Sequence, residues 1–328
     1  MLELFSLTEA LLVFWVVCGI LILLTNKTYR IIIFFGIFSL FSAILFLFTG
    51  APDVAVAEAA VSAFATVFFI VCIEQFYLRN KASDEKRLRF NTKAVLRGVF
   101  ACVLVVAAFL LFLWHVPDAE ISTYLKNQYL LLFRQDVGGQ NAVTSIYLGY
   151  RVYDTLFESL ILVIAVVAAS HMSWYDKDMV TDGLRSEIVN SSIAKFVMRI
   201  IGPIILVFGI YLAINGTISP GGGFQSGAVI ASFFICRYLV LNIYDLPIKK
   251  VAKLEEMIFI NIAILPIIVV FMSSLYLGTD PGPVFQNIYL TIMNGLIGLK
   301  VACGFFILFY RYIAIERLPD TVIQNKEL

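Results

Sequence analysis

Four stretches of this sequence carry ionisable or backbone-permissive residues inside otherwise apolar runs. An ionisable group at membrane depth costs about 3 kcal/mol or more unless it faces protein or water, so each is a candidate for handling ions. The charged candidates are Asp53, Glu58, Arg151, Asp154, Glu158 and Lys300. The uncharged candidates are Ser219, Pro220, Gly221, Gly222, Gly223 and Gln225, whose oxygens and backbone suit a sodium ion.

The first stretch, GAPDVAVAEAAVSAFATVFF, predicts a helix that starts at Gly50 and Pro52. Asp53 falls in its first turn, where the helix dipole favours a negative charge, and a simple capping role is the alternative. Glu58 lies deeper, on a face of small residues that suits close helix packing. A carboxyl group buried there can exchange a proton near neutral pH, and a structural hydrogen bond is the alternative.

The second stretch, NAVTSIYLGYRVYDTLFESLILVIAV, places Arg151, Asp154 and Glu158 at positions i, i+3 and i+7. This spacing puts the three side chains on one helical face. Asp154 is expected to pair with Arg151, and an interfacial salt bridge accounts well for the arginine. It accounts poorly for Glu158, which is expected one turn deeper and therefore belongs with the ion-handling candidates.

The third stretch, INGTISPGGGFQSGAVIAS, has three successive glycines after Pro220. Glycine permits backbone conformations that other residues avoid, and irregular backbone at a membrane is tolerated where it lines a cavity. Ser219, Gln225 and Ser226 add uncharged oxygens, so residues 219–225 are a candidate outer route for Na⁺. The alternative is a tight turn between two helices.

The fourth stretch, MNGLIGLKVACGFFILFY, contains Lys300 in the middle of an apolar run. Gly295, Gly298 and Ala302 form a predicted packing stripe. Lys300 precedes Arg311 by a length of helix that spans roughly 16 Å, which is too far for the lysine to reach the membrane surface easily. We therefore expect Lys300 to pair with a buried carboxylate or to line a hydrated proton path.

The whole chain predicts an all-α polytopic membrane protein. Of its 328 residues, 61% are hydrophobic and 14% are charged, against roughly 25% charged in soluble proteins. Continuous apolar runs of about 20 residues favour membrane-spanning helices and exclude the alternating pattern of β-spans. We predict about nine spans: 6–25, 29–49, 52–78, 95–116, 150–173, 196–215, 223–245, 255–277 and 288–311.

Lysine and arginine residues cluster after the first, third, fifth, seventh and ninth predicted spans. The positive-inside rule then puts the N-terminus outside and the C-terminus in the cytoplasm. No positive segment precedes the first run, so we count that run as a mature span. The outer connection 117–149 is expected to contain an interfacial helix with Tyr124, Tyr129, Leu132 and Phe133 on its apolar face. The polar segment 174–194 marks a predicted module boundary.

Other classes of function have little support in the sequence. Cys18, Cys72, Cys102, Cys236 and Cys303 form no CxxC pair, and His115 and His171 have no ligand-like neighbours, so no metal site is expected. No basic face with interleaved aromatics indicates nucleic acid. No nucleophile–base set or phosphate loop is present, so the chain is not expected to be an enzyme by itself.

The four stretches together resemble the small membrane subunits of Mrp-type Na⁺/H⁺ antiporters, which recur in membrane-bound hydrogenases. GAPDVAVAEAAV resembles the D-type subunit, NAVTSIYLGYRVYDTLFES the E-type region, and PGGGFQSG with NGLIGLKVACG the B subunit. Val152 stands where the E-type pattern usually has glycine. Thr217 stands where the B subunit often has a histidine, so no role for that histidine carries over.

The resemblance implies a fusion of three modules with three, two and four spans. These are a D-like module at 1–94, an E-like module at 95–178 and a B-like module at 179–328. It further implies Na⁺ and H⁺ as transported ions, a prokaryotic cytoplasmic (inner) membrane, and partners that are C-, F- and G-like and large antiporter-like subunits. In hydrogenase versions, iron–sulfur and nickel–iron centres would lie on partner subunits of a redox arm.

Two functions are open at this point. The chain supplies part of an ion path, with Glu58, Asp154, Glu158 and Lys300 carrying protons or charge, or it is a scaffold subunit without direct ion conduction. An autonomous transporter is weakened by the absence of matched broken helices in two halves.

Overall fold

The computed structural model describes residues 2–25, 27–79, 119–172, 192–241, 248–275 and 282–316, and these contain helices and short connections only. Eight of the helices are long and apolar enough to cross a membrane, which confirms an all-helical, multi-pass fold. The predicted span 95–116 lies outside the described residues. The chain divides into two compact units, residues 77–132 and the remainder.

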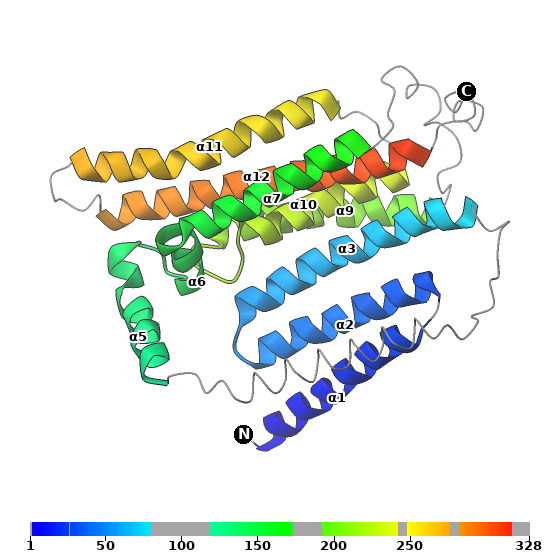
Figure 1. Cartoon of the computed structure of the whole chain (residues 1–328), viewed down its shortest axis with the longest axis horizontal. Coiled ribbons are helices and arrows are strands. Elements are labelled where there is room, and N and C mark those ends of the chain that lie inside the picture. The colour runs from blue at the N-terminus through cyan, green and yellow to red at the C-terminus, as the bar shows by residue number, and fades with distance from the viewer. Residues whose placement is uncertain are drawn as a thin grey trace, which may run out of the picture. The chain divides into compact units, whose positions relative to one another are not determined.

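The N-terminal part consists of α1 (Leu2–Leu24), α2 (Thr28–Phe48) and α3 (Pro52–Arg79), shown in Figure 1. Trp15 Nε1 on α1 donates to Ser42 Oγ on α2 at 2.7 Å. Gly50 has a φ of 79° and lets the chain turn between α2 and α3. The predicted helix start is confirmed, because Pro52 is the first residue of α3 and Asp53 lies in its first turn.

The connection predicted to hold an interfacial helix contains α5 (Ala119–Asp136), which confirms a helix there. It is followed by α6 (Ala142–Ser145), a π-helical turn η1 (Ile146–Tyr150) and α7 (Val152–Met172). The backbone N–H of Arg151 donates to the carbonyl of Ile146, the wider spacing of a π-helix. The predicted span beginning at residue 150 therefore starts two residues later as α-helix.

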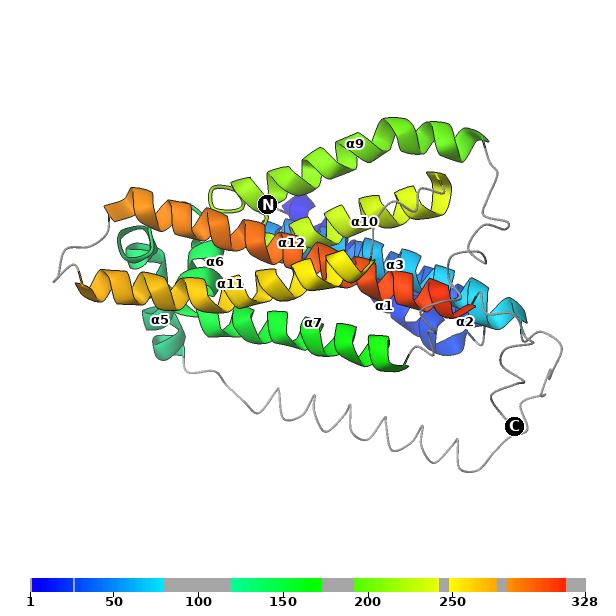
Figure 2. The same cartoon turned by 90° about the horizontal axis from the view of Figure 1, so that it is seen from above.

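The C-terminal part consists of α9 (Ser192–Asn215), α10 (Gly223–Leu241), α11 (Ile248–Leu275) and α12 (Gly282–Glu316). Pro203 lies inside α9 and Pro266 inside α11, as membrane helices tolerate when neighbouring groups satisfy the freed backbone. Figure 2 shows α12 running among these helices and α7, and it contacts α7, α9, α10, α11 and η1.

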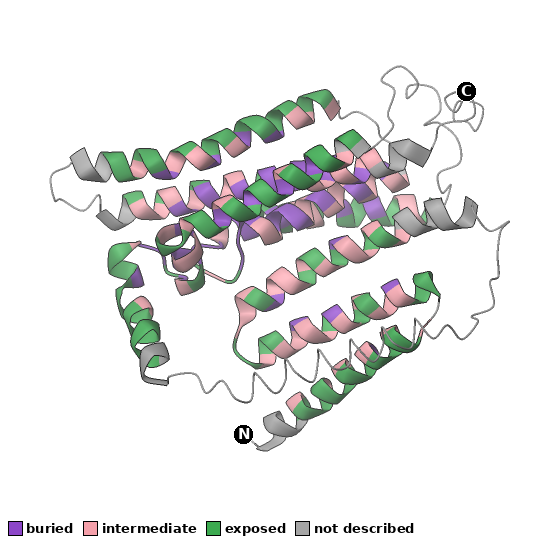
Figure 3. Ribbon diagram, in the orientation of Figure 1, coloured by how far each residue is buried: buried purple, intermediate pink, exposed green. Residues whose placement is uncertain are grey.

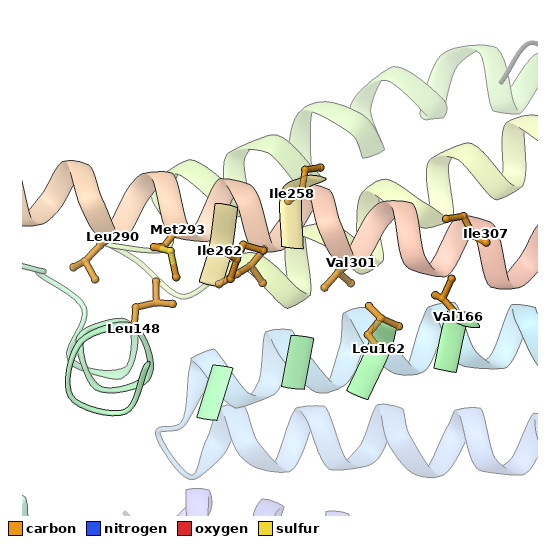
Figure 4. Packing of buried hydrophobic residues seen from close by; sticks show 10 residues of the cluster. Leu148, Leu162, Val166, Ile258, Ile262, Leu290, Met293, Val301 and Ile307 are labelled. Atoms are coloured by element: carbon orange, nitrogen blue, oxygen red, sulfur yellow. The ribbon is translucent and has the colours of Figure 1, made fainter. Parts of the chain in front are cut away.

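The α12 helix is the centre of the packing. In its membrane-length span 67% of residues are buried, against 6% in the span of α1 (Figure 3). Two apolar clusters surround it. The first joins α7, α11, α12 and η1 and is shown in part in Figure 4; its members are Leu148, Leu162, Val166, Ile258, Ile262, Leu290, Met293, Ile297, Val301 and Ile307. The second joins α3, α10 and α12, where Phe64 stacks on Phe305 with centroids 4.2 Å apart.

Glycines bring α10 and α12 into close contact. A methyl group on Gly223 would lie 2.6 Å from Cβ of Ile297, and one on Gly227 would lie 2.5 Å from Cβ of Val301. Gly298, a member of the predicted packing stripe, approaches the Ser226 hydroxyl in the same way. Gly295 was also assigned to that stripe, but a methyl group added there would meet nothing within 4 Å, so this part of the prediction was wrong. Small residues here let the helix backbones approach.

Gly227→Ala is expected to destabilise the folded protein by about 1–3 kcal/mol, the usual cost of overpacking. The added methyl would also meet the backbone carbonyl of Gly298 at 2.7 Å, which cannot move aside as a side chain can. Gly295→Ala is the matched control, because it adds the same group to open space in a helix. Thermal unfolding of the detergent-solubilised protein measures both. Equal unfolding temperatures for the two variants would contradict the packing account.

Candidate functional site

The deepest polar cluster is built around Lys300, whose side chain is completely buried. Its Nζ donates to the backbone carbonyl of Ser159 on α7 at 2.5 Å and lies 3.4 Å from Glu255 Oε1 on α11. The aromatic ring of Phe259 is 5.9 Å from the same ammonium group. The expectation that Lys300 pairs with a buried carboxylate is therefore confirmed.

The position of Glu255 explains why the pair forms inside the bundle. The α11 helix begins at Ile248, so Glu255 lies about two turns into it and its side chain is only 7% exposed. The predicted span was placed to begin at residue 255, which assigned this carboxylate to the membrane surface. Two opposite charges taken out of water together remain costly unless each is paired and hydrogen-bonded.

A second buried group lies on α12 two turns before Lys300. Asn294 Oδ1 accepts hydrogen bonds from the Tyr147 hydroxyl at 2.9 Å and from the backbone N–H of Gly223 at 3.1 Å. It thereby ties η1 and the start of α10 to α12. Burial raises the pKa of Tyr147 to about 12, so its phenol stays protonated at neutral pH and acts as the donor.

A third polar cluster, the Asn141 junction, joins segments from all three predicted modules. Asn141 Nδ2 lies 2.8 Å from Asp53 Oδ1, 3.2 Å from the carbonyl of Ser219 and 3.3 Å from the carbonyl of Gly216. Its Oδ1 caps α6 by accepting from the backbone N–H of Val143 at 2.9 Å. The backbone of Asn141 is fixed as well, because the Asn141 N–H donates to the carbonyl of Thr217.

Asp53 lies in the first turn of α3 and makes contacts outside that helix. Besides the Asn141 amide, it faces the backbone N–H of Gly221 at 3.4 Å. The carboxylate reaches across to the glycine turn of the predicted B-like module, which the capping alternative did not include. Asp53 and residues 219–225, predicted separately as charged and uncharged candidates, thus meet in one place.

The glycine turn itself is tightly packed. Gly221, Gly222 and Gly223 are all buried, whereas Pro220 is exposed. A methyl group on Gly222 would lie 2.6 Å from the Tyr147 hydroxyl and 2.7 Å from Gln225 Oε1. The Ser219 hydroxyl is engaged locally with Asn215. The glycines are required for close approach of backbone to Tyr147 and α12, which supports the tight-turn alternative without testing a role in ion passage.

Glu58 is half-buried on α3 and accepts a short hydrogen bond from the hydroxyl of Ser39 on α2. Ser39 itself is 3% exposed. Ala55, one turn before Glu58, is buried as well. The structural hydrogen bond considered as the alternative for Glu58 is thus present, and its protonation role stays a prediction.

The three charged residues at the start of α7 differ in their contacts. Arg151 and Asp154 form the predicted salt bridge, with Nη2 and Oδ2 2.5 Å apart, and both side chains are largely exposed. Glu158 is exposed too, and the described structure gives it no hydrogen bond. The side chain at the deeper, buried position is the next residue, Ser159, at 0% exposure. Glu158 lies one turn further along α7 than Asp154, as expected, but it does not pack against the other helices of this chain, and its ion-handling role stays a prediction.

Sequence reasoning missed several residues of the site: Asn141, Tyr147, Thr155, Ser159, Glu255 and Asn294. Asn141 had a usable signal, because asparagine before a helical segment is a typical N-cap. Asn294 lay within a quoted motif but is uncharged. Among the residues that the structure describes, no group of three or more His, Cys, Asp or Glu side chains could hold a metal ion.

Fold and site together define a polytopic, all-helical membrane subunit with a buried ion pair between α11 and the central helix α12. Residues 193–316 match the family model for the domain related to the MnhB subunit of the Na⁺/H⁺ antiporter. Residues 13–77 match MbhD, the family model for the D subunit of MBH. The resemblance predicted from the motifs is therefore confirmed, and the chain combines an MnhB-like segment with an MbhD-like one. The three module boundaries stay predictions.

Individual proteins are also similar to this chain in sequence. An uncharacterised protein of Methanocaldococcus jannaschii is 26% identical over 218 residues, covering 55% of this chain and 81% of that protein. The Na⁺/H⁺ antiporter subunit A1 of Staphylococcus aureus is 27% identical over 141 residues, covering 43% of this chain and 17% of that subunit. The chain thus spans less than a fifth of that antiporter subunit.

Two solved structures are similar. A chain of the archaeal membrane-bound sulfane sulfur reductase, a respiratory membrane complex, is 27% identical with a TM-score of 0.54, covering 66% of this chain and 97% of that chain. A chain of the Mrp complex from Dietzia sp. DQ12-45-1b has a TM-score of 0.62 at 19% identity, covering 90% of this chain and 34% of that chain, and this likeness concerns the fold alone.

Proposed function

We propose that this chain is a membrane subunit of a multisubunit Mrp-type cation/proton antiporter module and contributes buried charged residues to ion translocation. The observation that carries the proposal is the ion pair between Lys300 and Glu255 inside the helix bundle. Ionisable residues within membrane helices are rare because they are costly, and they commonly mark ion or proton pathways. The MnhB-like and MbhD-like segments support this type of complex.

Within the proposal, Glu58, Asp53, Asp154, Glu158 and Arg151 remain candidates for proton or charge transfer. Glu158 and the Arg151–Asp154 pair point away from this chain's own packing, so any such role would be exercised at a surface toward another subunit. For the proposed Na⁺ route at residues 219–225, the support is the group of oxygens around Asn141. The carbonyls of Gly216 and Ser219 and the carboxylate of Asp53 are ligand types that hard cations prefer.

The proposed partners are C-, F- and G-like subunits and large antiporter-like subunits, in a prokaryotic cytoplasmic membrane. The complex would exchange Na⁺ for H⁺, either alone or driven by a redox arm whose iron–sulfur and nickel–iron centres lie on other chains. Purification of the intact complex through this chain, followed by mass spectrometry of its subunits, distinguishes the two. Redox subunits in the preparation would show the driven form.

A scaffold role is the second candidate, and the Asn141 junction favours it. Its polar groups are satisfied within the chain and hold segments of the three predicted modules together. A scaffold predicts that substitutions in the buried polar groups impair assembly. An ion path predicts that the complex assembles and transport fails.

Glu58→Ala is expected to abolish ΔpH- or Na⁺-coupled transport in vesicles, because the half-buried carboxyl group is removed. The complex should still assemble, because the substitution leaves only the small Ser39 hydroxyl without its partner. Transport per assembled complex is the measurement. Glu9→Ala is the matched control, since Glu9 is an exposed glutamate on α1 and its loss changes the net charge equally. Full transport by the Glu58 variant would remove this residue from the mechanism.

A further inference from the structure

The buried face of α7 changes from polar to apolar along its length. Thr155 is 2% exposed and Ser159 is completely buried, and they lie one turn apart on the face toward α12. The same face continues with Leu162 and Val166, which belong to the apolar cluster around α12. Small hydroxyl residues therefore occupy the half of the face between η1 and Lys300, and apolar residues occupy the half beyond it.

Hydrogen bonds already connect much of this polar half. The Thr155 hydroxyl donates to the carbonyl of Tyr147 at 2.7 Å, and the Tyr147 hydroxyl donates to Asn294 Oδ1. At the other end, Lys300 Nζ donates to the carbonyl of Ser159. Polar groups from α7, η1 and α12 thus follow one another from Asn294 to the Lys300–Glu255 pair.

Two buried polar atoms along this line have no hydrogen-bond partner in the described protein: Ser159 Oγ and Asn294 Nδ2. Glu255 Oε1 lies 3.4 Å from Lys300 Nζ in the ion pair. All three atoms belong to residues that are at most 5% exposed. A buried polar atom without a partner is strongly unfavourable, and proteins commonly satisfy such atoms with bound water.

The opposite side of Lys300 is closed by apolar packing. Leu162 contacts Gly304, one turn beyond Lys300 on α12, where a methyl group on the glycine would lie 3.1 Å from the leucine side chain. Val166 and Ile307 continue the cluster, as Figure 4 shows. Along α7, Lys300 is therefore approached through polar groups from one direction only.

We propose that Thr155 and Ser159, together with water bound at Ser159 Oγ and Asn294 Nδ2, form a one-sided proton path from Tyr147 and Asn294 to the Lys300–Glu255 pair. The inference rests on the proposed function and specifies how protons reach its buried lysine. When Lys300 gives a proton to the Glu255 carboxylate, an N–H bond breaks and an O–H bond forms. The neutral amine takes a proton from the water at Ser159, and that proton is replaced along the path through the Thr155 hydroxyl and the water at Asn294 Nδ2 from water outside the protein. Glu255 then releases its proton to water, so one proton passes and every group ends unchanged.

Ser159→Ala tests the path in the intact complex, with transport per assembled complex and unfolding temperature both measured. We expect transport to fall at least about tenfold, less than the 10²- to 10⁴-fold of a direct acid–base group because water substitutes in part. The unfolding temperature should stay the same or rise, since the lost hydroxyl makes no hydrogen bond within the described protein. Ser232→Ala is the control, because that half-buried hydroxyl donates to the carbonyl of Ala228 in its own helix.

Thr155→Val and Thr155→Ser form a second, independent pair. Valine keeps the shape and removes the hydroxyl, so transport should fall, whereas serine keeps the hydroxyl and should restore most of it. Thr291→Val is the matched control, since that hydroxyl bonds the carbonyl of Asn287 within α12. A transport rate for Thr155→Val equal to that of the control would overturn the path.

The outcomes separate this inference from the proposed function. Full transport by Ser159→Ala and Thr155→Val, with transport abolished by Lys300→Met, would overturn the path and leave the ion-handling role of Lys300. Full transport by all three variants would overturn the proposed function as well. Failure of Ser159→Ala to assemble would also count against the path, because the hydroxyl would then have a structural role.

Discussion

Lys300→Met is expected to abolish transport and to lower the free energy of unfolding by about 3–5 kcal/mol, the usual cost of removing one partner from a buried ion pair. Methionine fills a similar volume, so the loss comes from leaving the Glu255 carboxylate unpaired among apolar neighbours. Ser159 loses its contact as well, since its carbonyl accepts from Lys300 Nζ at 2.5 Å. Transport per assembled complex and thermal unfolding in detergent measure the two effects.

The double variant Lys300→Met, Glu255→Leu separates stability from transport. Replacing both members of a buried pair by apolar residues is often neutral or stabilising, so much of the lost stability should return. Transport should stay abolished, because no titratable group remains at the centre. Glu256→Gln is the control for charge, since Glu256 is adjacent in sequence and exposed. Recovery of transport in the double variant would mean that the pair has only a structural role.

Asn141→Ala is expected to lower the free energy of unfolding by about 3 kcal/mol. This sums the loss of an N-cap, typically about 1 kcal/mol, and of a hydrogen bond to a charged carboxylate, about 1.5–3 kcal/mol. Asp53 Oδ1 and the Ser219 carbonyl would both lose the amide donor that now lies within 3.2 Å of them. Thermal unfolding and the amount of assembled complex measure the effect.

A series at the same position identifies which contact matters. Asn141→Ser keeps a capping oxygen and should cost less than alanine. Asn141→Asp places a second carboxylate against Asp53 and should lower the free energy of unfolding more than alanine does. Adding Asp53→Asn exchanges the amide and the carboxylate, so part of the lost stability should return. Gln140→Ala is the control, because Gln140 is exposed and its backbone N–H, which the substitution keeps, donates to the carbonyl of Thr217. Equal stability for Asn141→Ala and Gln140→Ala would contradict the junction.

Prediction from sequence and the structure differ most in which side chains of a helix face inward. Glu158 was selected because its charge is conspicuous in an apolar run, yet Ser159 beside it occupies the buried face. Successive residues on a helix differ by about 100° in direction, so the identity of the inward residue depends on where the neighbouring helices pack. The π-helical turn before α7 shifts that direction further, and nothing in the local residue types predicted it.

Residue types and their spacing were enough to predict a multi-pass helical membrane protein, a helix that starts at Pro52, and a Lys300 too deep to reach the surface. These follow from properties that add along the chain, namely apolar transfer free energy, proline at a helix start and the rise per residue. The partner of Lys300, Glu255, could be identified only from the packed helices. The same holds for the link that Asn141 makes between Asp53 and the glycine turn, and for the burial of Thr155 and Ser159 against α12. The reason is that hydrogen bonds and ion pairs form between segments far apart in the chain, and only the packing of helices fixes which side chains meet.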